Sequence, residues 1–214
     1  YEVVDPGRFP IGNNDYTSII NALKKEDVDI FAGVMITPDF ATAWRQFHQQ
    51  SFVPKVCTVA KATLYPSDVE AIGDDLGNGV VSEVWWTKNH PYSSSLTGQT
   101  SMQLAEMWET DRDKPSVVTT GYKHANVEIL VDVLQRAQSL DTEKILNAIE
   151  ETNLDTIIGN VQYDEQNVSE MYLVTGQWVK NEDGVWEQRI VANTRIPEVP
   201  LHEEGIIILP GCTK

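Results

Sequence analysis

The chain has 214 residues, of which 41% are hydrophobic and 22% charged, which is enough for one large or two small globular domains. Its net charge of −16 argues against a nucleic-acid partner, because binding to phosphates needs clustered Lys and Arg. No run of about 18 apolar residues occurs, so the sequence predicts no membrane-spanning helix.

Residues 15–36 read as a helix followed by a strand. Apolar side chains recur at i, i+3, i+4 and i+7 over 16–23, and Asp15 is placed to cap this helix. A nearly continuous apolar run covers 28–36, which predicts a strand that is buried on both faces. A helix and a strand in this order indicate an α/β fold.

The same unit is repeated immediately afterwards. Thr37 is placed as an N-cap and Pro38 suits the first helical position. A second helical stripe follows over 40–47, and Pro54 precedes a second strand over 55–60. Two consecutive units of this kind predict a doubly wound fold with parallel strands.

In open parallel sheets, ligands bind at the carboxyl ends of the strands, which here are followed by Thr37 and Lys61. At a helix amino terminus, Thr37 offers backbone N–H groups and a hydroxyl to an anion or a carbonyl. A plain capping role is the alternative for Thr37, and both roles can hold together.

The α/β pattern continues to about residue 90, and from residue 97 the character changes to helices. A short helical turn over 66–72 leads to a strand over 80–86 that ends in Trp85 and Trp86, and the polar stretch 89–95 looks like a crossing between lobes. Helices are then predicted over 97–110, 121–137 and 141–151, the last capped by Asp141, and strands over 158–164, 171–180 and 185–191, the last two joined by a turn over 181–184.

The chain begins without Met, and Tyr1–Val4 already reads as a strand. We therefore expect the sequence to start within a domain, as the carboxyl-terminal part of a longer protein. Few strands accompany the helices of 97–152, so these helices should expose apolar faces or pack on a neighbouring chain.

Nothing in the sequence predicts catalysis, a metal or a cofactor. The nucleophile elbow Gly-x-Ser-x-Gly, the phosphate loop Gly-x-x-x-x-Gly-Lys and the pairs His-x-x-x-His and Cys-x-x-Cys are all missing. Cys57 lies in an apolar strand and Cys212 in a Pro-Gly tail, and either a bridge between them or two free thiols is consistent with this. An α/β hydrolase remains the enzymatic alternative.

Four segments carry a family resemblance when taken in order. They read DYTSIINALKKEDVDIFAG with TPDFATAWRQ, then GYKHANVEILVDVLQRA, DTIIGNVQYDEQN and LVTGQWVKNEDG. Together they resemble the carboxyl-terminal portion of type I periplasmic binding proteins, in the branch of Leu/Ile/Val-binding receptors of branched-chain amino acid ABC transporters.

The resemblance implies two doubly wound α/β lobes joined by crossovers. Residues 1–90 and 171–214 would form the second lobe, and 91–170 the later part of the first lobe, whose amino-terminal portion is absent. It also implies the substrate-binding component of an ABC importer, which captures a small solute by lobe closure and delivers it to a membrane permease. A ligand-sensing receptor or regulator on the same fold is the alternative.

The implied location is the periplasm or the outer face of the cell membrane, with a lipid anchor in the missing amino terminus as one option. Amino-acid-binding members place an acidic residue near Lys61, where it pairs with the ligand ammonium. Lysine here would suit a carboxylate, so a carboxylic or aromatic acid becomes the favoured ligand over an amino-acid-like one. A solvated lysine at a strand end is the alternative.

Aromatic residues complete the predicted site. Trp85 and Trp86 could stack on a planar or apolar ligand, but neighbours in a strand point to opposite faces, so one of them belongs to the core. Tyr122 corresponds, by the resemblance, to an aromatic residue that lines the cleft, with core packing as the alternative.

Overall fold

A computed structural model describes residues 1–211, which divide into two compact units. Unit 1 comprises Tyr1–Glu83, Thr175–Ala192 and the described residues from Leu201 onward; unit 2 comprises Val84–Val174 and Asn193–Pro200. The first boundary thus falls before the residue 90 expected from the sequence. Residues 193–200, which we expected in the second lobe, lie with unit 2.

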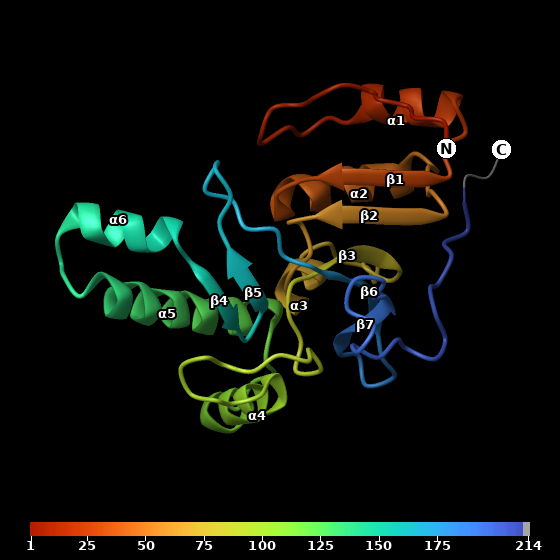
Figure 1. The fold of residues 1–214 in the computed structure, drawn as a ribbon. Coiled ribbons are helices and arrows are strands. Elements are labelled where there is room, and N and C mark those ends of the chain that lie inside the picture. Colours follow the sequence, from red (N-terminus) through yellow and green to blue (C-terminus); the bar gives the residue numbers. More distant parts are fainter. Residues whose placement is uncertain (212–214) are drawn as a thin grey trace. The chain divides into compact units, whose positions relative to one another are not determined.

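Unit 1 is built around one sheet, whose strands follow the order β1-β2-β3-β6-β7 (Figure 1). Its elements in chain order are α1 (Thr17–Lys25), β1 (Ile30–Val34), α2 (Thr37–Gln49), β2 (Val56–Ala60), α3 (Pro66–Glu70), β3 (Val80–Val84), β6 (Val174–Lys180) and β7 (Trp186–Ala192). The two helix–strand units predicted over residues 15–61 are confirmed, as are β3 and the final hairpin.

Strands β1 and β2 are parallel and lie side by side with their ends flush (Figure 1). Ile30 pairs with Val56 and Val34 with Ala60, so the two strands stop at the same level. β3 is parallel to β2. The carboxyl ends of all three strands therefore meet at one edge of the sheet.

Aromatic packing on α2 forms the core of unit 1. The rings of Phe31 in β1 and Phe47 in α2 are 5.1 Å apart in an edge-on arrangement. Trp44, which is 1% exposed, donates its indole N–H to the carbonyl of Leu76 at 2.7 Å. The helical stripe predicted over residues 40–47 is thus the face that covers the sheet.

The opposite face of β1 is open, which contradicts the prediction of a strand buried on both faces. Ile30 is 44% exposed and Val34 69% exposed. β1 is the edge strand of the sheet, and these two side chains stay open to solvent. Tyr1–Val4 also form no strand, contrary to expectation.

The hairpin of β6 and β7 turns at Asn181, whose side-chain oxygen accepts hydrogen bonds from the N–H groups of Asp183 and Val185. Lys180, at the end of β6, donates its backbone N–H to the side chain of Asn78, which precedes β3. The hairpin turn therefore lies at the edge of the sheet opposite to the carboxyl ends of β1, β2 and β3.

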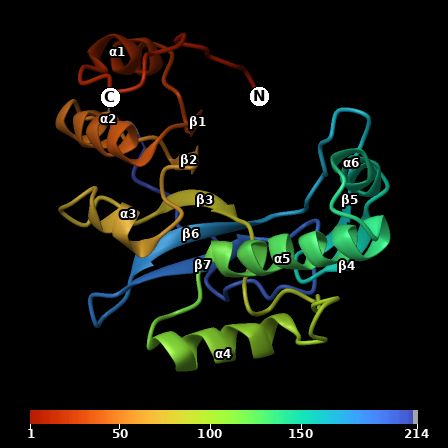
Figure 2. The same cartoon turned by 90° about the vertical axis from the view of Figure 1, so that its left-hand side faces the viewer.

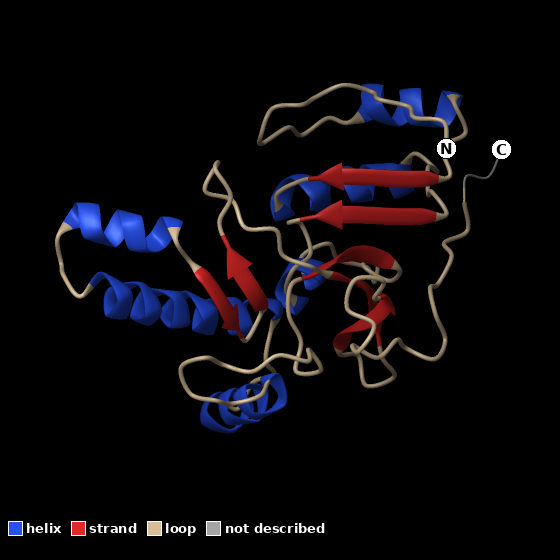
Figure 3. Ribbon diagram, viewed as in Figure 1, coloured by secondary structure: helices blue, strands red, loops and turns tan. Residues whose placement is uncertain are grey.

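Unit 2 contains three helices and a two-stranded ribbon (Figure 3). They are α4 (Ser101–Arg112), α5 (Val118–Ala137), α6 (Thr142–Glu150), β4 (Asn153–Thr156) and β5 (Gly159–Gln162). All three predicted helices are confirmed, and Asp141 caps α6 by accepting the N–H of Lys144. β4 was not predicted, because Asn-Leu-Asp-Thr lacks the apolar alternation of a strand.

Helix α5 is the longest element and organises unit 2 (Figure 2). A Cβ atom on Gly121 would lie 2.5 Å from Trp86, so the absence of a side chain there lets the helix backbone approach the indole directly. α6 folds back against α5, where Arg136 donates to the carbonyl of Ala148 and to the hydroxyl of Thr152.

Apolar side chains remain exposed on the helices of unit 2, as expected from the shortage of strands. Val127 and Leu130 on α5 are 48% and 56% exposed, and Leu146 on α6 is 50% exposed. Across the described chain, no helix combines the length and the apolar character that crossing a bilayer requires.

The thiol of Cys57 is free and buried, and burial raises its pKa. Cys212, the other candidate for a bridge, lies outside the described residues.

Candidate functional site

The first predicted site residue, Thr37, is the first residue of α2 and lies at the carboxyl end of β1. It is half-buried. The N-cap is Ile36, which has an extended backbone and whose carbonyl accepts the N–H of Phe40. The predicted capping role of Thr37 is therefore wrong by one position. Its place at a helix amino terminus still provides a hydroxyl and a backbone N–H group, the kind of groups that such positions can offer to an anion.

Lys61 directly follows β2 and adopts a left-handed backbone with φ of 68°. This conformation costs a non-glycine residue about 1 kcal/mol or more, so the surroundings must hold it in place. The chain after it is fixed, since the carbonyl of Thr63 accepts the indole N–H of Trp178 at 2.7 Å and the hydroxyl of Ser82 at 3.1 Å.

Glu83 holds the backbone of Lys61 from the neighbouring strand. Its Oε1 accepts the N–H of Lys61 at 2.9 Å. The side chain of Lys61 is exposed, and its ammonium makes no ion pair with any described residue. The edge of the sheet thus presents a hydroxyl, a free ammonium and a carboxylate, one from the end of each parallel strand.

The second oxygen of Glu83 is the unusual atom of this edge. Oε2 is buried and has no hydrogen-bond partner among the described residues. A buried acceptor without a donor costs about 1–3 kcal/mol, and buried polar groups are rarely left in this state. The residue as a whole is half-buried and lies one position before the end of β3.

The sequence prediction missed Glu83. It considered an acidic residue only at the end of β2, where the resemblance places one. The available signal was a carboxylate inside the strand predicted over 80–86, because a charge in a buried strand needs a specific partner or role.

Two of the predicted aromatic residues meet in unit 2. The rings of Trp85 and Tyr122 are 5.6 Å apart and tilted by 55°, and both side chains are half-buried. Burial, and secondarily the nearby Tyr92, raises the pKa of Tyr122, so its hydroxyl stays protonated at neutral pH. The pair offers apolar ring surface and one hydroxyl.

Trp86 is the core residue of the two tryptophans. It is 1% exposed, and its indole N–H donates to the hydroxyl of Ser101 and the carbonyl of Ile157, both at 3.2 Å. It presents no surface to a ligand and leaves Trp85 as the candidate.

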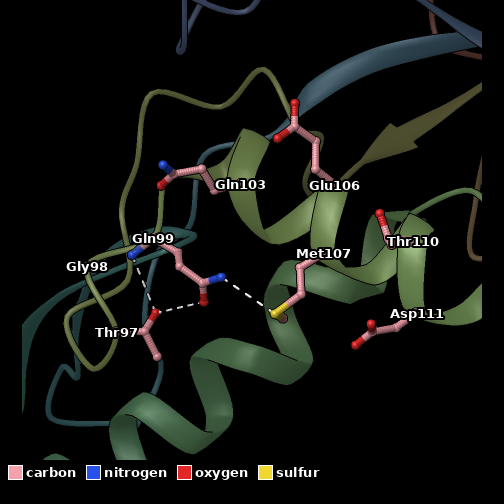
Figure 4. A pocket seen from close by; sticks show the side chains of 8 residues that line it. All are labelled: Thr97, Gly98, Gln99, Gln103, Glu106, Met107, Thr110 and Asp111. Carbon is pink, nitrogen blue, oxygen red and sulfur yellow. Dashed lines mark hydrogen bonds between the residues drawn. The ribbon is translucent and has the colours of Figure 1, made fainter.

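A separate open hollow of about 530 Å³ lies between α4 and the loop before it (Figure 4). Gln99 donates to the sulfur of Met107 at 3.5 Å across it, and Thr97 donates to Gln99 at 3.0 Å. None of the predicted site residues lines it. The side chains that do so are polar except for Met107, and most of them are exposed, so the hollow offers a ligand little enclosure.

His90 gives unit 2 a pH-dependent stability. It is 5% exposed, its Nδ1 accepts the N–H of Thr87 at 2.9 Å, and burial lowers its pKa to about 4. In the unfolded chain the pKa of His90 is about 6.5. Between pH 6.5 and 4 the imidazole is therefore protonated in the unfolded state and neutral in the folded state. The free energy of unfolding should therefore fall as the pH is lowered through this window.

The contribution of His90 is up to about 3 kcal/mol over this window. In His90→Asn, whose side-chain oxygen can still accept the N–H of Thr87, urea unfolding should depend less on pH between 6.5 and 4 than in the unmodified protein. An identical pH dependence in the two proteins would show that His90 does not titrate differently on folding.

Comparisons with known proteins agree with the fold. A family model described as periplasmic binding protein matches residues 1–183. Among solved structures, the leucine binding protein LivK from Thermotoga maritima superposes with a TM-score of 0.69 at 21% identity, covering 86% of this chain and 50% of that one.

Two further structures align over a similar range. A putative branched-chain amino acid ABC transporter from Rhodospirillum rubrum gives a TM-score of 0.58 at 16% identity, covering 85% of this chain and 50% of that one. LivJ from Streptococcus pneumoniae, solved in complex with isoleucine, gives 0.58 at 10% identity, covering 86% and 50%. The chain thus spans about half the length of these proteins.

The predicted α/β class with parallel strands is confirmed by the sheet of unit 1 and by these structures. Strand order, the position of α2 after β1 and the family match over 1–183 all agree with one assignment. The chain belongs to the periplasmic binding protein family.

Proposed function

We propose that this chain is part of the substrate-binding component of an ABC importer, which captures a small carboxylic or aromatic acid by lobe closure. The observation that carries the proposal is the ammonium of Lys61, free of ion pairs with described residues, at the carboxyl end of a parallel strand. Solutes bind at this edge in open α/β sheets. Membership of the periplasmic binding protein family supports solute binding as the task.

The charges at this edge favour an anionic solute. An ammonium without a partner can form a charge-assisted hydrogen bond with a carboxylate, and a bond of this kind is stronger than one between neutral groups. Thr37 adds a hydroxyl at the neighbouring strand end. In unit 2, Trp85 and Tyr122 supply ring surface of the kind that packs on the apolar part of an organic acid.

A thermal-shift and calorimetric screen of the full-length protein tests this function. Carboxylic acids should raise the melting temperature, because a ligand that binds only the folded state stabilises it. Each acid is paired with its amide, for example 4-methylpentanoate with 4-methylpentanamide and 3-phenylpropionate with 3-phenylpropionamide. Amides that bind as tightly as the acids would overturn the assignment of Lys61 to a carboxylate.

The transport role has its own test. We propose that the protein works in the periplasm or at the outer face of the membrane and hands its solute to a permease. Deletion of its gene should abolish uptake of the solute identified in the screen. Unchanged uptake, with a changed transcriptional or motile response to the same solute, would indicate a sensor on the same fold.

A further inference from the structure

The carboxylate of Glu83 has one oxygen in use and one oxygen free. Oε1 accepts the N–H of Lys61 at 2.9 Å, and this bond fixes the direction of the carboxylate. Oε2 is buried without a donor from the described residues. A carboxylate that is held on one side and unsatisfied on the other is ready to accept a hydrogen bond from another molecule.

The position of Glu83 places this acceptor at the ligand edge of the sheet. β2 and β3 are parallel neighbours, and Glu83 lies near the carboxyl end of β3 while Lys61 follows the end of β2. Lys61, whose N–H donates to Glu83, has a left-handed backbone with φ of 68°, a conformation that costs a non-glycine residue free energy. Strained backbone of this kind is concentrated at ligand-binding sites.

We propose that Oε2 of Glu83 accepts a hydrogen bond from an O–H or N–H donor of the bound solute, and that Glu83 is therefore a residue that determines specificity. The inference rests on the proposed function and adds a second recognised group to the carboxylate. The solute then carries both an anionic group for Lys61 and a hydroxyl or ammonium for Glu83. A buried carboxylate accepts such a donor more strongly than one in water.

Two sets of matched acids test the inference on the full-length protein. The aliphatic set is 4-methylpentanoate, 2-hydroxy-4-methylpentanoate and leucine; the aromatic set is 3-phenylpropionate, 3-phenyllactate and phenylalanine. Within each set the skeleton and the carboxylate are constant, and only the group on carbon 2 changes from H to OH to NH₃⁺. We expect a donor-bearing member of at least one set to bind about tenfold to hundredfold more tightly than the donor-free acid.

The decisive variant is Glu83→Gln. Its amide oxygen can still accept the N–H of Lys61, while the NH₂ group takes the place of Oε2 and offers a donor where an acceptor stood. The preference for donor-bearing acids should disappear, and the affinity for the donor-free acid should change less than threefold. If the natural donor is charged, Glu83→Gln should lose more affinity for the amino acid than for the hydroxy acid. This difference distinguishes an ammonium-bearing solute from a hydroxyl-bearing one.

Glu182→Gln is the matched control. It removes the same charge from the same unit, but Glu182 is exposed in the hairpin turn at the opposite edge of the sheet, so the preference should persist. Equal melting temperatures for the two variants without ligand would show that the lost preference does not come from a loss of stability.

The outcomes separate the two proposals. Equal binding of all members of both sets, or a preference that survives in Glu83→Gln, overturns the inference and leaves the proposed function in place. No binding of any of the six acids overturns the proposed function, and the inference with it.

Discussion

Replacing Lys61 by methionine is expected to weaken the binding of a carboxylate solute by about tenfold to hundredfold. A hydrogen bond to a charged group contributes about 1.5–3 kcal/mol, and each 1.4 kcal/mol is a factor of ten in affinity. Methionine keeps an unbranched apolar stem and places no new demand on the left-handed backbone at this position. Calorimetric titration with 4-methylpentanoate and 3-phenylpropionate measures the change.

The stability of the Lys61→Met variant should be unchanged, because the ammonium makes no ion pair with a described residue. Its affinity should also respond less to salt than that of the unmodified protein, since the screened charge is gone. Lys25→Met, on the exposed end of α1, is the control: it removes the same charge, together with a surface ion pair to Glu26. An undiminished affinity in Lys61→Met would show that Lys61 is a solvated lysine at a strand end and does not contact the solute.

The sequence predicted the order of the elements better than their surroundings. The apolar run over 28–36 specifies a strand, and β1 formed within it at Ile30–Val34. A run of this kind does not reveal which strand lies at the edge of the sheet, so the exposure of Ile30 and Val34 could not be read from it. The burial of a strand depends on which other segments pack against it, and the apolar pattern of the strand itself does not show this.

Site residues that lie at strand ends could be predicted from the fold topology. A contact between residues of two different strands could not be predicted in this way. Thr37 and Lys61 were found because parallel strands end at a common edge. The contact between Glu83 and the N–H of Lys61 joins residues from two different strands, and only the register of β2 and β3 brings them together. The choice between Trp85 and Trp86 likewise required the close approach of α5 at Gly121.

Replacing Glu128 by glutamine is expected to destabilise unit 2 by about 2–4 kcal/mol. Glu128, on α5, is 1% exposed and accepts three hydrogen bonds. Oε1 accepts from the N–H of Ser95 at 2.6 Å and its hydroxyl at 2.9 Å, and Oε2 accepts from the N–H of Ile157 at 3.1 Å. The carboxylate thus fastens the loop before α4 and the turn between β4 and β5 to one helix.

Glutamine has the same shape but only one accepting oxygen, so its NH₂ group must face a backbone N–H on one side. Each buried donor left without an acceptor costs about 1–3 kcal/mol, and the opposed donors add repulsion. Hydrogen exchange measures the effect locally: the amides of Ser95 and Ile157 should exchange faster in Glu128→Gln, while those of β1 and β2 in unit 1 should not change.

Glu106→Gln provides the matched control for Glu128. Glu106 lies on α4 and is exposed, so the same substitution should change the free energy of unfolding by less than about 0.5 kcal/mol. A loss of stability in Glu106→Gln equal to that in Glu128→Gln would attribute the effect to net charge. With a net charge of −16, the removal of one negative charge should if anything relieve repulsion, so a large loss confined to Glu128 identifies the three buried hydrogen bonds as its cause.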